Sequence, residues 1–249
     1  MAQPWRKGIV KHIVHETPST RRYWIEVPEL DVFDFKPGQF VTLDLPIHEK
    51  PARRWRSYSI ASWPDGTNVF ELVIVLLEGG AGTKYIFNEV KEGSELMFRG
   101  AQGVFTLPDP IDRDLFFICT GTGIAPFRSM AHHILNYNVP HKNIYLIFGC
   151  RTISDALYMK EMQELAEKVT SFRYIPTFSR EEPENYNHLI RTGYVHSVYE
   201  EIIQGKKADD AAPPASFYLC GWKNMIDEAK QRIQALGYDR KAIHQELYG

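Results

Sequence analysis

The chain has 249 residues, of which 44% are hydrophobic and 24% are charged, as in folded globular proteins. This composition excludes an intrinsically disordered chain and a collagen-like one. Lys and Arg number 29 and Asp and Glu 31, a net charge of −2, whereas general nucleic-acid-binding proteins carry a basic excess, so we expect no nucleic-acid partner.

The first hundred residues are predicted to form short β-strands separated by turns. Turn residues such as Pro37-Gly38 and Glu92-Gly93 separate segments that are rich in apolar and β-branched residues. The expected strands are residues 7–16, 23–27, 40–45, 55–61, 69–77 and 95–99, with one helix over 82–90. The pattern indicates a small antiparallel barrel or sandwich over residues 1–107.

Beyond Pro108, apolar strands alternate with segments of helical periodicity. The expected strands are 115–119, 144–148, 172–178, 217–220 and 242–247, and the expected helices are 125–138, 154–169, 195–203 and 225–236. Such alternation is typical of βαβ units with a parallel sheet and helices on both of its faces. We therefore predict an α/β domain over residues 108–249.

Cysteine usage and hydropathy narrow the class of protein further. None of Cys119, Cys150 and Cys220 lies in a C-x-x-C pair, so we expect no metal site, no iron–sulfur cluster and no disulfide scaffold. No apolar run reaches eighteen residues, and Met1–Val14 has no signal-peptide pattern. These features predict a cytoplasmic protein without membrane insertion.

Two motifs in the first domain suit a phosphate-bearing aromatic ligand. In the strand segment Arg56-Ser57-Tyr58-Ser59, alternation places Arg56 and Tyr58 on one face and the two serines on the other. An arginine binds pyrophosphate bidentately and a tyrosine offers a flat ring. Gly79 to Thr83 precedes a helix whose N-terminus attracts anions. The alternatives are a surface arginine beside an ordinary strand tyrosine, and a flexible turn with a capping threonine.

Three motifs follow strands of the second domain. Gly121-Thr122-Gly123, with Pro126 in the first helical turn, predicts a dinucleotide phosphate site, although the third glycine of G-x-G-x-x-G is absent. Ser179-Arg180 could hold a ribose 2′-phosphate, or belong to a charged loop, because Glu181 and Glu182 follow. Cys220-Gly221 could pack against a bound ring, although a lone cysteine is usually a small buried hydrophobe.

Taken in order, these motifs resemble those of the plant-type ferredoxin–NADP⁺ reductase superfamily over nearly the whole chain. The matching segments are Arg56–Ser59 (R-x-Y-S), Gly80–Thr83 (G-x-x-S/T), Gly121–Pro126 (G-T-G-I-A-P) and Cys220–Met225 (C-G-x-x-x-M). The resemblance implies an N-terminal Greek-key antiparallel β-barrel that binds FAD and a C-terminal α/β domain with a parallel sheet that binds NADP(H). It implies that FAD lies in a cleft between the two domains.

The resemblance also implies roles for individual residues. Arg56 and Thr83 would hold the FAD pyrophosphate, Tyr58 would pack on the flavin, and Ser59 would lie near flavin N5. Cys220 would stand by the nicotinamide, and the tail residues Glu246 and Tyr248 would assist proton delivery and cover the flavin. Other expected cofactor-binding residues are Ser57, Gly80, Gly82, Gly121, Thr122, Gly123, Pro126, Arg151, Ser179, Arg180, Gly221 and Met225.

The function implied is that of a flavin-dependent reductase acting between NADP(H) and a one-electron carrier such as ferredoxin or flavodoxin. Ser179-Arg180 favours NADP(H) over NAD(H). Basic residues could face an acidic carrier, or most could be solvated surface charges with Arg56 on FAD (Arg21, Arg22, Lys50, Arg53, Arg54, Arg56). We expect a monomer. Two alternatives stay open, namely an NADH-dependent reductase component of an oxygenase system and a flavin electron-transfer subunit without nucleotide turnover.

Overall fold

The computed structural model describes residues 3–182, 190–207 and 211–247. Contacts divide the chain into two units, of which one contains residues up to Leu107 together with Ala125–Asn138 and the other contains Pro108–Ile124 and the residues from Val139 onward. The boundary at residues 107 and 108 stays a prediction, because one helix groups with the first unit. Within the described ranges, no helix is long and apolar enough to cross a membrane.

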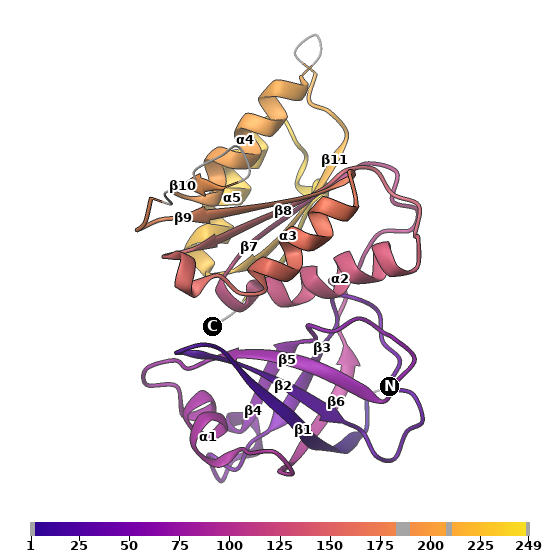
Figure 1. Cartoon of the computed structure of the whole chain (residues 1–249), viewed down its shortest axis with the longest axis vertical. Helices are drawn as coiled ribbons and strands as arrows, with labels where there is room; N and C mark the ends of the chain where they lie inside the picture. The colour runs from indigo at the N-terminus through magenta and orange to yellow at the C-terminus, as the bar shows by residue number, and fades with distance from the viewer. Residues whose placement is uncertain (1–2, 183–189, 208–210, 248–249) are drawn as a thin grey trace. The chain divides into compact units, whose positions relative to one another are not determined.

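The first unit is an antiparallel barrel. Its strands are β1 (Trp5–Thr17), β2 (Thr20–Glu26), β3 (Phe40–Asp44), β4 (Trp55–Ser59), β5 (Val69–Val75) and β6 (Glu95–Gln102), in the order β4-β3-β6-β1-β2-β5 (Figure 1). Beyond β4, the N–H of Ala61 donates to the carbonyl of Glu71 in β5 at 2.8 Å, which joins the two edges of the sheet. A short 3₁₀ turn, η1 (Pro51–Arg53), precedes β4, and helix α1 (Ala81–Glu89) follows β5. The predicted antiparallel fold is confirmed.

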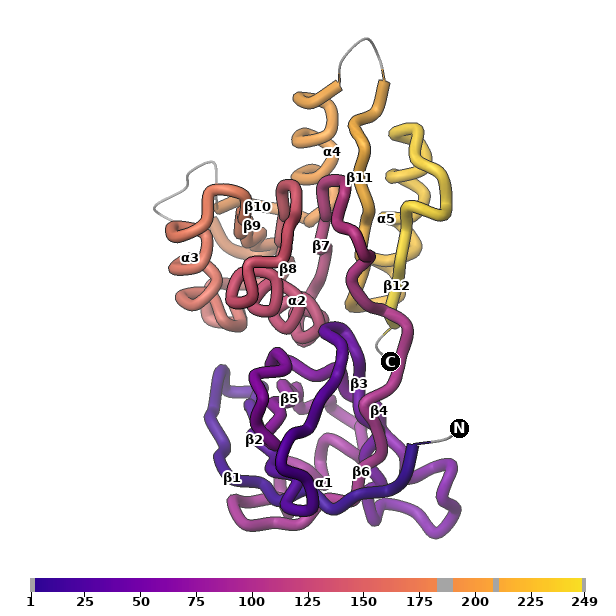
Figure 2. Tube along the Cα trace, turned by 90° about the vertical axis from the view of Figure 1, so that its right-hand side faces the viewer, coloured from indigo at the N-terminus to yellow at the C-terminus, as the bar shows by residue number. Residues whose placement is uncertain are grey.

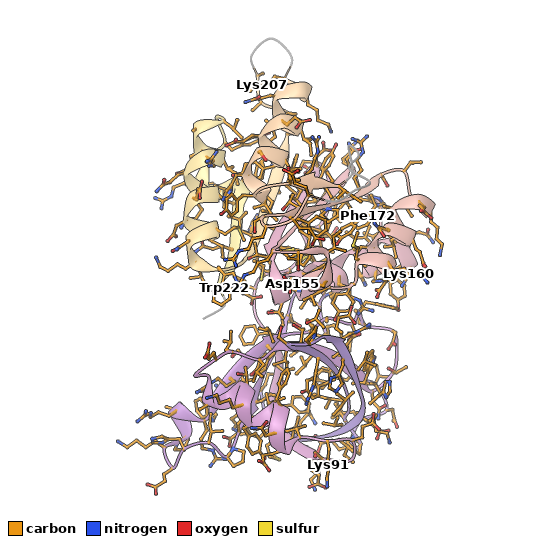
Figure 3. All side chains as sticks on the ribbon, turned by 60° about the vertical axis from the view of Figure 1, so that its left-hand side comes forward. Lys91, Asp155, Lys160, Phe172, Lys207 and Trp222 are labelled. Carbon is orange, nitrogen blue, oxygen red and sulfur yellow. The ribbon has the colours of Figure 1, made fainter. Side chains whose placement is uncertain are left out.

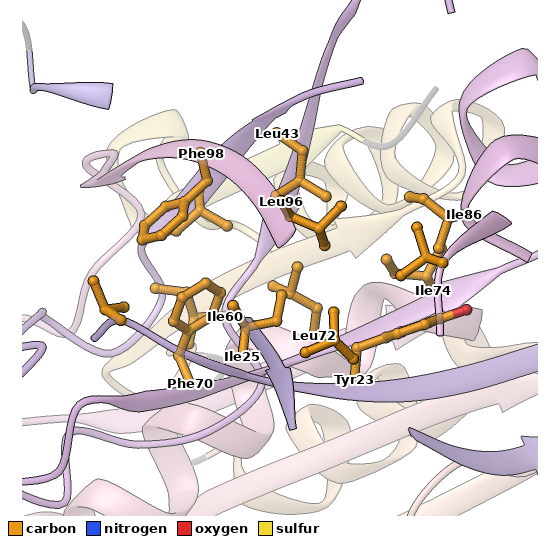
Figure 4. Packing of buried hydrophobic residues seen from close by; sticks show 14 of the residues in the cluster. Tyr23, Ile25, Leu43, Ile60, Phe70, Leu72, Ile74, Ile86, Leu96 and Phe98 are labelled. Atoms are coloured by element: carbon orange, nitrogen blue, oxygen red, sulfur yellow. The ribbon is translucent and has the colours of Figure 1, made fainter. Parts of the chain in front are cut away.

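The barrel interior is filled by alternate side chains of these strands. Tyr23, Phe70 and Phe98 point into one apolar cluster, which Ile86 of α1 joins from the side (Figure 4). The ring centroids of Phe70 and Phe98 are 5.1 Å apart. Such aromatic pairs add about 0.5–1.5 kcal/mol beyond the burial of their area. The core therefore secures the strands that carry the first motif.

The second unit is a parallel sheet. Its strands are β7 (Asp114–Thr120), β8 (Ile144–Cys150), β9 (Phe172–Phe178), β10 (Arg191–Thr192), β11 (Ala215–Gly221) and β12 (Ile243–Leu247), in the order β10-β9-β8-β7-β11-β12. Helices α4 (Val195–Lys206) and α5 (Lys223–Ala235) pack on one face of the sheet (Figure 2). Strand order reverses at β7, whose neighbours are β8 and β11. In open α/β sheets, ligands bind beyond the carboxyl ends of the strands at such a reversal.

Two local details differ from the sequence prediction. The helix predicted over residues 154–169 begins only at Met159, as α3 (Met159–Lys168). A 3₁₀ turn, η3 (Ile153–Asp155), precedes it, and Tyr158 has a left-handed φ of 54°, which interrupts helical geometry. Strand β10 was not predicted, because two residues carry no detectable periodicity.

Helix α2 (Ala125–Asn136) groups with the barrel rather than with the sheet unit. Its Arg128 is 5% exposed and donates to the carboxylate of Glu71 in β5 at 2.9 Å. The same carboxylate accepts a 2.6 Å hydrogen bond from Arg22 of β2. A buried ionic group thus joins α2 to two strands of the barrel.

Candidate functional site

The R-x-Y-S motif occupies strand β4 of the barrel. Arg56 and Tyr58 are opposite the buried residues Leu43 and Val41 of β3, while Ser57 is exposed on the other face, as the alternation predicts. Tyr58 packs against the barrel core, and burial raises the pKa of its phenol to about 12. Its ring therefore stays neutral at physiological pH and can serve as a flat apolar surface.

Arg56 and the start of helix α1 form one cationic surface. A Cβ at Gly82 would lie 3.0 Å from Cγ and 3.2 Å from Nε of Arg56, so the arginine side chain lies close against the first turn of the helix. The N-cap residue of α1 is Gly80, which has no side chain that could cap the helix. The guanidinium and the helix N-terminus together present positive charge and free backbone N–H groups. These residues fit the pyrophosphate of a dinucleotide.

Thr83 and Ser59 are more enclosed than their predicted roles suggest. The Oγ1 atom of Thr83 accepts from the N–H of Leu77 at 3.1 Å and donates to the carbonyl of Gly80 at 3.2 Å. Thr83 thus fixes the turn that leads into α1. Ser59 lies at the end of β4, opposite Phe40, and is 4% exposed. Their direct cofactor contacts stay predictions.

Arg56→Ala is expected to weaken FAD binding by about 10- to 100-fold, because one charge-assisted hydrogen bond contributes about 1.5–3 kcal/mol. The dissociation constant of the apoprotein, measured by quenching of FAD fluorescence, checks this expectation. Arg53→Ala is the matched control, since Arg53 is exposed and offers Arg56 only its backbone carbonyl. Equal FAD affinity in both variants would remove Arg56 from the site.

In the sheet unit, two glycine-containing turns meet where the strand order reverses. The 3₁₀ turn η2 (Gly121–Ile124) follows β7, and Gly221 ends the neighbouring strand β11. A Cβ at Gly123 would lie 2.3 Å from the carbonyl oxygen of Cys220, and one at Gly221 would lie 2.3 Å from Oγ1 of Thr120. Both positions therefore require glycine, because the η2 turn packs directly against the end of β11.

Some of the other residues predicted for the nucleotide site lie near the carboxyl ends of the parallel strands. Cys220 is fully buried and lies opposite Glu246 in the register of β11 and β12. Met225 packs against the sheet core, and its Cε lies 3.1 Å from a Cβ built on Gly221. Pro126 is buried in the first turn of α2. Tyr248 lies outside the described residues.

The proposed 2′-phosphate residues lie on the loops that follow β8 and β9. The N–H of Ser179 donates to Cys150 at 3.0 Å and that of Arg180 donates to Arg151 at 2.9 Å, which extends the pairing of the two strands. Arg151 and Arg180 are both exposed. Figure 3 shows Asp155 of this region and Trp222 toward one end of the sheet unit, with Lys207 at the opposite end.

Two contacts in these regions had no sequence signal. Glu181 binds the backbone of Ile153, 28 residues away, and Arg128 binds Glu71, 57 residues away. No local pattern reports pairs at such separations. Within the described part of the chain, no group of three His, Cys, Asp or Glu side chains could hold a metal ion.

Comparisons with known proteins agree with this geometry. The family model "Oxidoreductase FAD-binding domain" matches residues 7–107, and "Oxidoreductase NAD-binding domain" matches residues 117–231. Ferredoxin--NADP reductase B of Sorangium cellulosum is 32% identical over 233 residues, covering 93% of this chain and 93% of that protein. The chain belongs to the ferredoxin–NADP⁺ reductase superfamily. It is a flavin-dependent oxidoreductase that binds FAD and a nicotinamide nucleotide.

Other relatives of this reductase are oxygenase components. The glycine betaine monooxygenase reductase subunit of Pseudomonas aeruginosa is 29% identical over 261 residues, covering 99% of this chain but 66% of that protein. Amycolatopsis cytochrome P450 reductase GcoB has a TM-score of 0.83 at 25% identity, with 98% of this chain and 70% of that chain covered. A Neisseria gonorrhoeae ferredoxin NADP⁺ reductase with bound FAD and NADP has a TM-score of 0.80 at 24% identity, with 98% of both chains covered. The reductase thus shares its fold with both groups.

Proposed function

We propose that this reductase transfers electrons between NADP(H) and a one-electron carrier protein of the ferredoxin or flavodoxin type. The observation that carries the proposal is the adjacent pair Arg151 and Arg180 at the carboxyl edge of the parallel sheet. Two guanidinium groups there suit the extra phosphate of NADP(H). The relative from Sorangium cellulosum, which bears the name of such a reductase, supports the same activity.

The residues of the chain bind and orient the two nucleotides. When bound, FAD would supply the chemistry that links hydride transfer from a nicotinamide to the release of single electrons. Arg56 and the start of α1 hold the FAD pyrophosphate, and Tyr58 supports a ring. The η2 turn holds the phosphates of the second nucleotide. The proposed catalytic residues are Ser59, Cys220, Glu246 and Tyr248.

The direct experiment uses the purified protein under anaerobic conditions. Bound FAD should give its visible absorbance, which NADPH should bleach and an added ferredoxin or flavodoxin should restore. Colourless protein that takes up no FAD, or flavin that neither reduced nucleotide bleaches, would refute the proposal. Bleaching by NADH alone would favour the oxygenase reductase alternative, for which the glycine betaine monooxygenase reductase is the model relative.

Arg180→Ala is expected to lower kcat/KM for NADPH by about 10- to 100-fold while kcat/KM for NADH stays within about twofold. The lost interaction is a charge-assisted hydrogen bond to a phosphate that NADH lacks. Arg173→Ala is the control, because Arg173 is exposed on β9 and lies near the opposite end of this strand from the loop that carries Arg180. An equal loss for both nucleotides would assign Arg180 a structural role instead.

The basic residues proposed for carrier docking fall into two groups. Arg21 donates to the carbonyl of Phe87 at 2.9 Å, Arg22 is bound to Glu71, and Arg54 donates to Asp44 at 2.8 Å, so none of the three is available to a partner. Lys50 and Arg53 beside the η1 turn are exposed. We therefore place the docking site for an acidic carrier at Lys50 and Arg53. A cytoplasmic location belongs to this proposal, since all three cysteines are free thiols.

A further inference from the structure

Glu181 lies directly after Arg180, where a negative charge would be expected to repel a phosphate. Its carboxylate is instead committed to the protein backbone. Oε2 of Glu181 accepts a hydrogen bond of 2.7 Å from the N–H of Ile153. Ile153 is the first residue of the η3 turn, so the carboxylate occupies a backbone donor that the turn itself leaves unpaired.

The loop that begins with Arg151 is held at three points. Oδ2 of Asp155 accepts from the N–H of Thr152 at 3.3 Å and from its hydroxyl at 2.9 Å, which closes a capping box. The carbonyl of Arg151 accepts a hydrogen bond from the N–H of Arg180, and the N–H of Ile153 donates to the carboxylate of Glu181. The first contact shapes the loop, whereas the other two connect it to the residues that follow β9.

Both carboxylates accept hydrogen bonds from the backbone of the loop, Asp155 from the N–H of Thr152 and Glu181 from that of Ile153. Burial above all, and then the charges of Asp155 and Glu181, raise the pKa of the Cys150 thiol to about 12. Cys150 ends β8 and precedes Arg151 directly. Asp155 and Glu181 are half-buried, while Arg151 and Arg180 are exposed to solvent.

We propose that Glu181 is a positioning residue for the 2′-phosphate of NADP(H). Its bond to Ile153 fastens the loop after β8 to the end of β9 and so holds Arg151 beside Arg180. The proposal rests on the NADP(H) preference proposed above. It assigns to an acidic side chain a favourable effect on the binding of an anion.

The test compares 2′,5′-ADP with 5′-AMP as calorimetric probes, because the two differ only in the 2′-phosphate. The wild-type reductase should bind 2′,5′-ADP more tightly. Glu181→Ala should reduce this preference by about five- to tenfold, the size of a lost hydrogen bond, with 5′-AMP affinity unchanged. Glu181→Gln keeps an acceptor oxygen for Ile153 and should retain the preference. Glu182→Ala, which removes an exposed neighbouring charge, should not reduce it.

A second variant removes the donor without altering Glu181. Ile153→Pro deletes the N–H at the first position of a helical turn, where proline is favoured, and Thr152 already has the extended backbone that precedes proline. This variant should reproduce the loss seen with Glu181→Ala. It keeps the test decisive if the alanine variant does not fold.

The results that would contradict the role of Glu181 differ from the result that would refute the NADP(H) preference. If Glu181→Ala and Glu182→Ala both increase the preference for 2′,5′-ADP, Glu181 repels the phosphate and the proposal is overturned. Equal weakening of both probes by Glu181→Ala and Ile153→Pro also overturns it, since the loop would then be only structural. A wild-type reductase that binds both probes equally refutes the NADP(H) preference as well, whereas a preference left unchanged by both variants refutes the role of Glu181 alone.

Discussion

Glu71→Ala is expected to lower the free energy of unfolding by about 3–5 kcal/mol, the usual cost of removing one partner from a buried ion pair. The carboxylate of Glu71 is 2% exposed and accepts hydrogen bonds from Arg22 at 2.6 Å and from Arg128 at 2.9 Å. Alanine would leave two largely buried guanidinium groups without this acceptor. Urea unfolding monitored by circular dichroism measures the change.

The matched control is Glu95→Ala, because Glu95 forms an exposed pair with Lys7 that should contribute at most about 1 kcal/mol. The double variant Glu71→Leu with Arg128→Met removes two of the opposing charges together and should recover part of the lost stability. A Glu71→Ala variant within about 1 kcal/mol of the wild type would show that the ionic group contributes little to the barrel.

Gly123→Ala is expected to reduce kcat/KM for the nicotinamide nucleotide by about 100-fold, since a misplacement of about 1 Å at a binding site has effects of this size. The new Cβ would meet the carbonyl oxygen of Cys220 at 2.3 Å and its carbonyl carbon at 2.7 Å. Both atoms belong to the backbone of a buried central strand and cannot move aside as a side chain would. The η2 turn must shift instead. FAD content should stay unchanged, because Arg56 and α1 belong to the other unit.

Gly205→Ala provides the control for this substitution. Gly205 lies in helix α4, and a Cβ there meets no atom within 4 Å. The alanine should leave nucleotide kinetics unchanged and should stabilise the helix by about 0.5–1 kcal/mol. Steady-state kinetics and FAD absorbance of the two variants decide the matter. Unchanged nucleotide kinetics in Gly123→Ala would exclude the η2 turn from the binding site.

Helices and strands with strong apolar periodicity were predictable from the sequence. Strand β9 was predicted with its observed bounds, and the helix predicted over 225–236 is α5 with its ends shifted by one or two residues. Apolar periodicity reports the face that a segment buries, and glycine and proline report where it ends. The order of the four motifs then indicated the family, which the comparisons show.

The contacts that shape the sites were not predictable in the same way. Helix α2 has an apolar face like any helix of an α/β domain, and nothing in that face shows that Arg128 meets Glu71. The charge of Glu181 suggested a polar loop, whereas its bond to Ile153 depends on the pairing of β8 with β9. Thr83 has the residue type of a phosphate ligand, yet its hydroxyl serves the turn before α1. For Arg128 and Glu181 the deciding partner is far away in the sequence, and for Thr83 it is the local turn geometry.

The grouping of α2 with the barrel bears on how the gene can be divided. A fragment ended at Leu107, where the FAD-binding family model ends, would lack the segment that contains Arg128. The carbonyl of Ala61 and the carboxylate of Glu71 would then lose their shared donor, and Trp63 would lose the ring of His132 that stacks on it at 4.2 Å. An excised flavoprotein module therefore has to be assembled from two stretches of the coding sequence, with a linker replacing the strand and turn between them.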